Sequence, residues 1–306
     1  MDRTPSWQPA EASGIAIRWI EANGLTFEVA EAGEGEHLAL CLHGFPELHY
    51  SWRHQIPLLA KKGYRVWAPN LRGYGATDRP QGIGAYRLNV LEQDIAALID
   101  ASGATSVTLI AHDWGALIAW HFAIRKVRPL ARLVIMNVPH PKCAQRELKR
   151  WRQLKKSWYI FAFQVPRLFD WLLARDGAAS MERIFQGSAV NAERFDAETV
   201  RPYREAAARP GATSAMLNYY RALLRYPDAR QIGDGQVNVP TLVVWGEQDV
   251  AIDIHVLDGM DDYVPDLAVE RLPDASHWVQ QDAPDAVNAI LDDWLPPAIQ
   301  HPMLKG

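Results

Sequence analysis

The chain has 306 residues, 48% of them hydrophobic, and a formal net charge of −4 at pH 7; this length supports one large core or one core with an inserted lid, and the mild acidity argues against a nucleic-acid partner. The sequence contains neither a signal-peptide-like apolar region at its N-terminus nor a run close to the roughly 18 apolar residues that a membrane span requires. The two cysteines, Cys41 and Cys143, make no disulfide framework, and we therefore predict a cytoplasmic protein.

In chain order, strands and helices alternate over the first part of the sequence. After a polar arm at 1–13, an Asn-Gly pair at 23–24 separates two alternating segments, which predicts a β-hairpin. Short apolar runs predict further strands, and apolar residues at helical spacing predict the helices between them. The predicted strands are 15–20, 25–30, 38–42, 64–68, the segment ending at 112, 133–138, 241–245 and 269–272; the predicted helices are 51–61, a helix around 91–99, one that begins near 113 and one after Pro284.

The alternation stops between about 142 and 230, where the sequence is helical and offers no convincing strand. We therefore predict a doubly wound α/β fold with a mostly parallel sheet and an inserted helical lid. The expected division is a core at 1–139, a helical cap at 140–232 and the rest of the core at 233–306.

The cap begins with a run of basic residues between 142 and 156. We interpret this run as a solvated helix face. Contact with a membrane surface is the less favoured alternative, because the overall charge does not support it.

The segment 107–116 carries the main chemical signal. An apolar strand runs into a sharp break at Asp113, a helical pattern follows, and small residues occupy the positions two before and two after it, Ala111 and Gly115. This layout is typical of a nucleophile elbow, in which only small neighbours let strand and helix approach each other. A carboxylate at this position can attack carbon directly and leave an ester on the protein. The alternative for Asp113 is an N-cap of the following helix.

Hydrolysis of such an ester needs a base for water and a group that orients the base. His277 and Asp249 each follow a predicted strand, and loops beyond the carboxyl ends of parallel strands form the site in open α/β sheets. The chain order nucleophile, acid, base is that of α/β-hydrolases. Glu247 and Asp253 are rival orienters, whereas Asn137, at another strand end, cannot carry the required charge.

Charge builds on the side-chain oxygen of Asp113 when water attacks the ester, and backbone N–H groups must meet it. Trp114, directly after the nucleophile, can supply one N–H, and Phe45 can supply the other. Gly44 would permit the turn of this loop, and Pro46 is a candidate for a cis peptide bond.

These motifs resemble those of the α/β-hydrolase superfamily and, within it, the soluble epoxide hydrolases. The resemblance covers about 15–295. The loop 43–47 (HGFPE) resembles the family's HGxP loop, and 112–115 (HDWG) resembles its nucleophile motif. The acid and base motifs are similar to 246–249 (GEQD) and 276–278 (SHW).

The family also has two lid tyrosines that protonate the epoxide oxygen as the ring opens. The segment 218–221 (NYYR) resembles one of these motifs and 158–164 (WYIFAFQ) the other, which implies Tyr220 and Tyr159. Tyrosine suits the role because a phenol with a pKa of about 10 is neutral at pH 7 and can still donate a proton. Tyr219 and Tyr220 point roughly 100° apart on a helix, so only one of them should face the pocket.

The expected function is conversion of an epoxide to a vicinal diol through an ester on Asp113, in a protein that is a monomer or a homodimer. His43, Pro46, Trp158 and Phe163 are expected to line the substrate pocket. We predict no metal or cofactor, because the sequence offers neither a cluster of metal ligands nor a phosphate-binding glycine loop.

Two alternatives stay open at this point. A haloalkane dehalogenase shares the Asp elbow and Trp114 but needs N–H donors for the halide, and Trp158 beside Tyr159 could be one. A fluoroacetate dehalogenase would be expected to carry Arg at position 114. A non-catalytic small-molecule binder on the same scaffold is the alternative from another class, and an intact triad argues against it.

Overall fold

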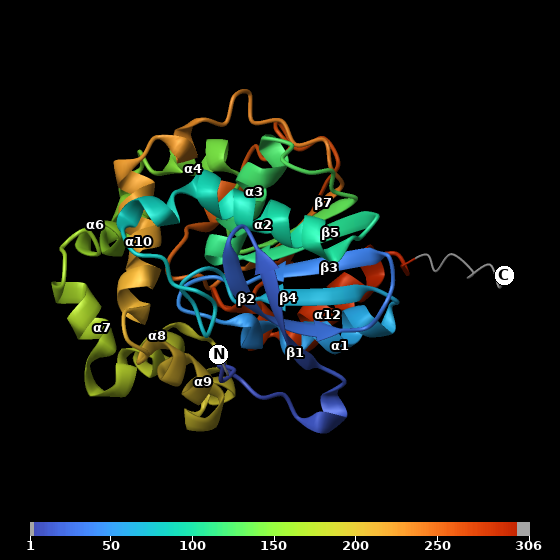
Figure 1. The fold of residues 1–306 in the computed structure, drawn as a ribbon. Helices are drawn as coiled ribbons and strands as arrows, with labels where there is room; N and C mark the ends of the chain where they lie inside the picture. Colours follow the sequence, from blue (N-terminus) through green and yellow to red (C-terminus); the bar gives the residue numbers. More distant parts are fainter. Residues whose placement is uncertain (1–2, 299–306) are drawn as a thin grey trace.

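An eight-stranded sheet forms the centre of this computed structural model, which describes residues 3–298 (Figure 1). Its strand order is β1-β2-β4-β3-β5-β6-β7-β8; β1 and β2 form the antiparallel hairpin, β2 is antiparallel to β4, and the remaining pairs are parallel. The strands are β1 Ala16–Ala22, β2 Leu25–Ala32, β3 His37–Leu42, β4 Arg65–Pro69, β5 Ser106–His112, β6 Arg132–Met136, β7 Thr241–Gly246 and β8 Leu267–Leu272. The predicted mostly parallel, doubly wound sheet is therefore confirmed.

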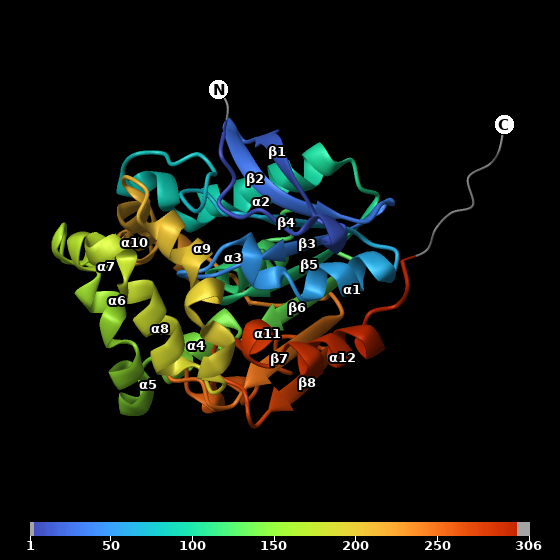
Figure 2. The ribbon, with the colours of Figure 1, turned by 90° about the horizontal axis from the view of Figure 1, so that it is seen from below.

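Helices cover both faces of the sheet. Helices α2 (Leu88–Ser102) and α3 (Asp113–Ile124) lie on one face, and α1 (Gln55–Lys61) and α12 (Pro284–Trp294) lie on the other, with the four-residue helix α11 (Val279–Asp282) beside α12 (Figure 2). Alternate residues of each strand enter the two cores: Leu38, Leu40 and Leu42 of β3 face α2 and α3, and Ala39 and Cys41 belong to the opposite core. Strands buried on both faces explain the continuous apolar runs in the sequence.

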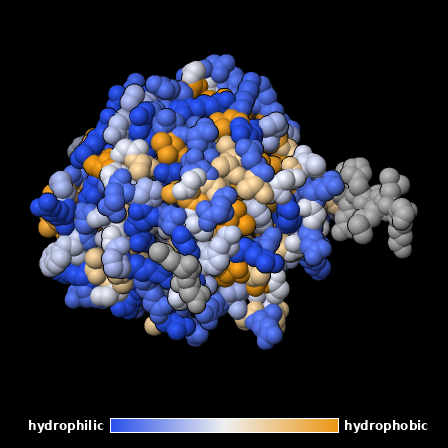
Figure 3. Space-filling model, viewed as in Figure 1, coloured by the Kyte–Doolittle hydropathy of each residue, from blue (hydrophilic) through white to orange (hydrophobic). Residues whose placement is uncertain are grey.

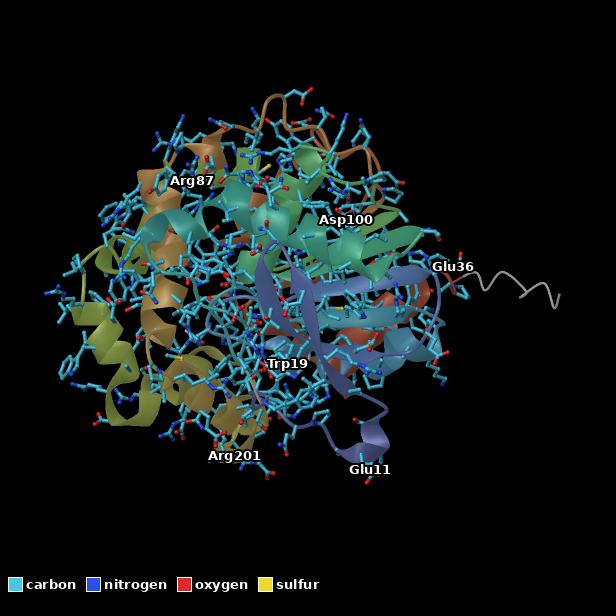
Figure 4. All side chains as sticks on the ribbon, viewed as in Figure 1. Glu11, Trp19, Glu36, Arg87, Asp100 and Arg201 are labelled. Atoms are coloured by element: carbon cyan, nitrogen blue, oxygen red, sulfur yellow. The ribbon has the colours of Figure 1, made fainter. Side chains whose placement is uncertain are left out.

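Seven α-helices lie between β6 and β7, in the segment for which the sequence predicted helices and no strand. They are α4 Pro141–Glu147, α5 Trp151–Lys156, α6 Trp158–Ala162, α7 Leu168–Ala178, α8 Ser180–Ser188, α9 Ala197–Ala207 and α10 Ala212–Arg225. They gather at the end of the sheet from which the β5–α3 turn emerges (Figures 1 and 2). Arg87, at the start of α2, donates hydrogen bonds of 2.9 and 2.8 Å to Asp228 and so ties the core to the end of this segment (Figure 4).

One local expectation is corrected, and one gains detail. The helix expected at 51–61 begins at Gln55, after a 3-10 turn at His49–Trp52. The arm expected at 1–13 is held against the sheet where it is described: Ser6 donates from its N–H and its hydroxyl to the buried carboxylate of Glu28, and Arg3 pairs with Asp78 at 2.8 Å. Buried polar groups of the sheet thus find their partners in the arm. Residues 1 and 2 lie outside the described range.

None of the helices in residues 3–298 has the length and apolarity needed to cross a bilayer. The face seen in Figure 3 is mostly hydrophilic, with small apolar areas scattered over it.

Candidate active site

Asp113 occupies a strained backbone position between β5 and α3. Its φ of 47° is in the left-handed region, which a residue other than glycine rarely adopts. A Cβ on Gly115 would come within 2.4 Å of the Leu42 carbonyl oxygen, so a glycine is required where α3 passes β3. This is the geometry of a nucleophile elbow, and it lifts the Asp113 side chain out of the sheet at the start of the helix.

His277 and Asp249 meet Asp113 at the carboxyl ends of the strands. His277 Nε2 lies 3.5 Å from Asp113 Oδ2, and His277 Nδ1 lies 2.6 Å from Asp249 Oδ2. Asp249 follows β7 and His277 follows β8, so three separate strand ends contribute to one cluster, in which Asp249 and His277 are buried. In space, His277 therefore lies between the carboxylate of Asp113 and the orienting carboxylate of Asp249.

Asp249 is held by donors on several sides. Asn137 donates to its Oδ2 at 2.8 Å, and the N–H groups of Ala251 and Ile252 donate to its Oδ1 at 2.7 and 2.8 Å. Burial acts to raise the pKa of Asp249, but the charge and hydrogen bond of His277, with these donors, hold that pKa below its usual value.

The rival orienters lie elsewhere. Glu247 pairs with Arg271 at 2.7 Å, and Asp253 caps the 3-10 turn at Ile254–Leu257. Asn137, which cannot replace the acid, instead supports it.

His277 stands between two carboxylates. Burial acts to lower its pKa, but Asp249 and Asp113 raise the pKa well above the usual value for histidine. For Asp113, burial acts to raise the pKa, and the hydrogen bond and charge of His277, together with the Phe45 N–H, hold it below the usual value. Asp113 is therefore ionised at neutral pH, as a carboxylate nucleophile must be.

The loop after β3 reaches over Asp113. The Phe45 N–H donates to Asp113 Oδ1 at 2.6 Å, and the Phe45–Pro46 peptide bond is cis. Gly44 matters for a reason other than the expected turn: a Cβ there would lie 2.3 Å from the Cβ of Asp113. The absence of a side chain on Gly44 thus leaves room for the nucleophile.

A buried network that the sequence analysis missed supports this loop. Glu47 Oε2 accepts hydrogen bonds from the Gly44 N–H at 3.0 Å and from His112 Nδ1 at 2.7 Å, and His112 Nε2 donates to the His277 carbonyl at 2.8 Å. The two ring nitrogens of His112 thus connect the loop after β3 with the segment after β8. Gln280 and Gln281 donate to Glu47 Oε1, each at 2.8 Å. The only sequence signal for this network was that His112 and Glu47 fall inside the two motifs.

His43 and Pro46 had been expected in the substrate pocket, and both are buried. His43 accepts the Leu71 N–H at Nε2, at 3.0 Å, and its Nδ1 donates to the Gly44 carbonyl at 2.8 Å. Burial lowers the pKa of His43 to about 4, so the ring is neutral. With both ring nitrogens bonded to backbone, His43 holds the Gly44–Phe45 loop in place.

Tyr159 of α6 and Tyr220 of α10 lie together above Asp113. Their ring centroids are 5.9 Å apart, and both residues line the same cavity as Asp113. Burial, and then the negative charge of Asp113, raise the pKa of both phenols. The Tyr159 hydroxyl has no hydrogen-bond partner among residues 3–298. Tyr220 is hydrogen-bonded to the indole of Trp114, which can only donate, so both phenols keep their own proton available to a ligand. Tyr219 instead donates to the Arg72 carbonyl at 2.9 Å, as its different helix face requires.

Of the other two pocket residues that we expected, Phe163 is buried and packs against Phe45 and Tyr220 at centroid distances of 5.7 and 5.1 Å. Trp158 is placed differently: its side chain is 63% exposed and points away from the cavity that Tyr159 lines. Neighbouring residues of α6 point about 100° apart, which separates the two side chains.

The cavity has a volume of about 350 Å³ and runs along one face of α3. Asp113, Leu117 and His121 line it from the nucleophile outward, over about 12 Å at 1.5 Å per residue. Helices α4, α6 and α10 form the opposite wall, mostly with apolar side chains. In the described part of the chain, His, Cys, Asp and Glu side chains form no group of three suited to holding a metal ion.

A parallel sheet, an elbow at the carboxyl end of its central strand, and a His–Asp pair after two later strands define the α/β-hydrolase class of protein. Comparison with known proteins agrees, because the family described as "alpha/beta hydrolase fold" matches residues 40–284.

Several relatives have names that are more specific. Epoxide hydrolase 4 of Homo sapiens is 36% identical over 279 residues, a match that covers 89% of this chain and 76% of the human one. Epoxide hydrolase A of Mycobacterium tuberculosis is 32% identical over 311 residues, a match that covers 91% of this chain and 96% of the mycobacterial one. An epoxide hydrolase of Bacillus megaterium, solved with an inhibitor, superposes with a TM-score of 0.83 at 33% identity and covers 90% of this chain and 99% of that one. The chain belongs to the epoxide hydrolase family of α/β-hydrolases.

Proposed function

We propose that this protein hydrolyses epoxides to vicinal diols through a covalent hydroxyalkyl ester on Asp113. The observation that carries the proposal is the carboxylate of Asp113, which lies 3.5 Å from His277 Nε2 and shares a cavity with the phenols of Tyr159 and Tyr220. The names of the relatives support the same reaction.

In the first step Asp113 attacks one ring carbon of the epoxide, and the bond from that carbon to the ring oxygen breaks. The oxygen takes a proton from Tyr159 or Tyr220, which polarise it from two sides. Although the raised pKa makes each phenol a weaker acid, it also keeps the phenol protonated until an alkoxide forms beside it.

In the second step His277, oriented by Asp249, removes a proton from water. The water oxygen adds to the carbonyl carbon of the Asp113 ester, and the N–H groups of Phe45 and Trp114 hold the resulting oxyanion. Collapse breaks the ester bond, releases the diol and restores the carboxylate. The proton of the added hydroxyl goes to the leaving oxygen of the diol, and His277 keeps the proton that it took from water.

The two chemical steps also change the pKa of His277. While Asp113 is ionised, its charge favours the protonated imidazole. Esterification removes that charge, so the pKa of His277 falls and the imidazole passes its proton to the tyrosinate left by ring opening, at the moment when a base is needed. Attack and hydrolysis thus follow each other without a change of pH.

Further parts of the proposal concern the whole protein. We infer that residues 140–232 form a cap domain over a core made of 1–139 and 233–306, that the protein acts in the cytoplasm as a monomer or homodimer, and that it uses no metal or cofactor. Two buried thiols without a disulfide, Cys41 and Cys143, support a reducing compartment.

The decisive experiment traps the ester. Asp113→Asn should abolish single-turnover conversion of styrene oxide, and His277→Gln should accumulate a protein adduct with the mass of the substrate, localised to Asp113 by mass spectrometry. In wild-type enzyme, one turnover in ¹⁸O-water should place the label in Asp113. Full activity of Asp113→Asn, or label in the diol alone, would reject the covalent route. Chloride release from a chloroalkane without diol formation would instead identify a dehalogenase.

A further inference from the structure

The cap carries a concentration of exposed apolar side chains that the catalytic reaction does not explain. Eight of the twelve exposed large apolar side chains in residues 3–298 fall within a stretch of 24 residues, in and around α5, α6 and α7. They are Leu148, Trp151, Leu154, Trp158, Phe161, Val165, Leu168 and Trp171. Single exposed apolar residues are normal, but eight within one stretch of the cap, three of them tryptophans, indicate an interaction surface.

The same stretch is strongly basic. Residues 148–175 contain seven basic residues and one acidic residue, although the whole chain has a charge of −4. The acidic residue, Asp170, is bonded to Arg221 and Ser214. Three of the seven cations pair with carboxylates outside the stretch: Arg150 and Arg152 with Glu147, and Arg175 with Asp176. Lys149, Lys155 and Arg167 are exposed and have no carboxylate partner among the described residues.

Cations and indoles are interleaved on this surface. Lys155 lies over the ring of Trp151, at 5.2 Å, and Arg175 lies over the ring of Trp171, at 5.3 Å. In each pair the cation follows the indole by four residues, one helical turn, so both side chains emerge on the same side. We call this group, residues 148–175 of α5 to α7, the aromatic–basic cap surface.

The surface adjoins the catalytic cavity. In α6, Tyr159 and Ile160 line the cavity, whereas Trp158 and Phe161 are exposed. Leu148 belongs to both, since it lines the cavity and is also 45% exposed. Leu148 therefore joins the lining of the cavity to the aromatic–basic cap surface.

We propose that the aromatic–basic cap surface docks on an anionic lipid surface, and that the cavity takes up lipophilic epoxides dissolved in that surface. The second clause rests on the proposed function; the first does not. Tryptophan places an apolar ring and a polar N–H at the boundary between headgroups and acyl chains, and basic side chains are attracted by anionic headgroups. The net charge of the whole chain is a poor guide to this attraction, because charges more than about 8 Å away are largely screened at physiological salt. The charge of the cap surface itself therefore determines whether it is attracted to anionic lipid.

Charge also argues against the other occupant, a second copy of this chain. A twofold interface would place the same patch against itself, with basic residues opposite basic residues. An anionic surface has no such repulsion.

The test is cosedimentation with phosphatidylcholine vesicles with and without phosphatidylserine. The wild-type protein should bind only the phosphatidylserine vesicles and should dissociate at high salt. Trp151→Ser/Trp171→Ser and Lys149→Glu/Lys155→Glu should each lose most of the binding. Lys61→Glu/Lys126→Glu changes the charge equally at exposed core positions, and Val269→Ser removes an exposed apolar side chain from β8; both controls should bind like wild type.

A second measurement separates docking from catalysis. Hydrolysis of a long-chain epoxide embedded in the phosphatidylserine vesicles should slow several-fold in the tryptophan variant, whereas hydrolysis of a small water-soluble epoxide should not change. If the wild type hydrolyses neither of the two epoxides, the proposed function fails, and the vesicle-binding measurement still tests whether the surface docks on lipid. Absence of wild-type binding, equal loss in the controls, or a wild-type dimer in light scattering that the tryptophan variant dissociates would overturn the proposal.

Discussion

Adjacent side chains on the cap helices lie in different surroundings. Tyr220 faces the cavity while Tyr219 donates to the Arg72 carbonyl, and Tyr159 faces the cavity while Trp158 is exposed. The roughly 100° between neighbouring helical residues separates the two side chains of each pair. In this structure both positions that line the cavity are phenols, which can donate a proton to an epoxide oxygen.

Removing one phenol should weaken ring opening without unfolding the cap. For Tyr220→Phe and Tyr159→Phe we expect kcat/KM for an epoxide to fall roughly 10²- to 10⁴-fold, the usual worth of a positioned proton donor. Stopped-flow tryptophan fluorescence of the alkylation step measures the loss. Tyr219→Phe is the matched control and should leave alkylation nearly unchanged; an equal loss there would mean that packing, and not proton donation, is at stake.

The pH dependence should separate the two chemical steps. Asp113 has a pKa below its usual value, so alkylation should be insensitive to pH in the neutral range. Hydrolysis needs neutral His277, so its rate should rise with pH through the pKa of the histidine in the ester. Asp249 raises the pKa of His277, and Asp249→Asn should therefore lower the apparent pKa of hydrolysis as well as slow it. Single-turnover kinetics across pH measure both; an apparent pKa that moves upward contradicts the assignment.

At the scale of elements, two glycines set how closely the loop after β3 and helix α3 approach the nucleophile. A Cβ on Gly44 would collide with Asp113, and a Cβ on Gly115 would collide with the Leu42 carbonyl oxygen. The Glu47–His112 pair then links the Gly44 loop to the carbonyl of His277. The catalytic groups are thus positioned by backbone contacts between three strand ends.

Alanine substitutions at the two glycines should have different effects on activity and on stability. Gly44→Ala should cost most of the activity, because the new methyl displaces Asp113 or Phe45, and Gly115→Ala should lower the free energy of unfolding because backbone has to move. Gly187→Ala in α8 is the control, since its Cβ meets nothing within 4 Å; it should stabilise by up to about 1 kcal/mol. Urea unfolding and epoxide turnover distinguish the three, and full activity of Gly44→Ala would contradict the close approach.

For the whole molecule, the helical segment between β6 and β7 and the core together enclose an apolar cavity that extends about 12 Å from Asp113 along α3. Apolar burial stabilises by about 0.8 kcal/mol per CH₂ group. We therefore expect apolar epoxides that extend along α3 to be the better substrates.

The length of the alkyl chain of the epoxide should therefore control how well it is hydrolysed. In a series of 1,2-epoxyalkanes, kcat/KM should rise with each added CH₂ by up to about fourfold and level off when the cavity is filled. Leu117→Trp should bring the plateau to shorter chains, because Leu117 lies between Asp113 and His121. Steady-state kinetics along the series test this, and a length-independent kcat/KM would show that the substrate does not enter along α3.

Local residue patterns were enough to predict the sheet, the hairpin, the helical insertion and the meeting of Asp113, Asp249 and His277. These features depend on strand and helix periodicity and on the rule that strand carboxyl ends share one edge of the sheet. Tertiary packing decided the rest: that His43 holds a loop, that Trp158 is exposed, that Gly44 makes room for the nucleophile, and that Glu47 and His112 support the site. Side-chain direction and long-range contacts depend on neighbours far apart in the chain, which a local pattern does not contain.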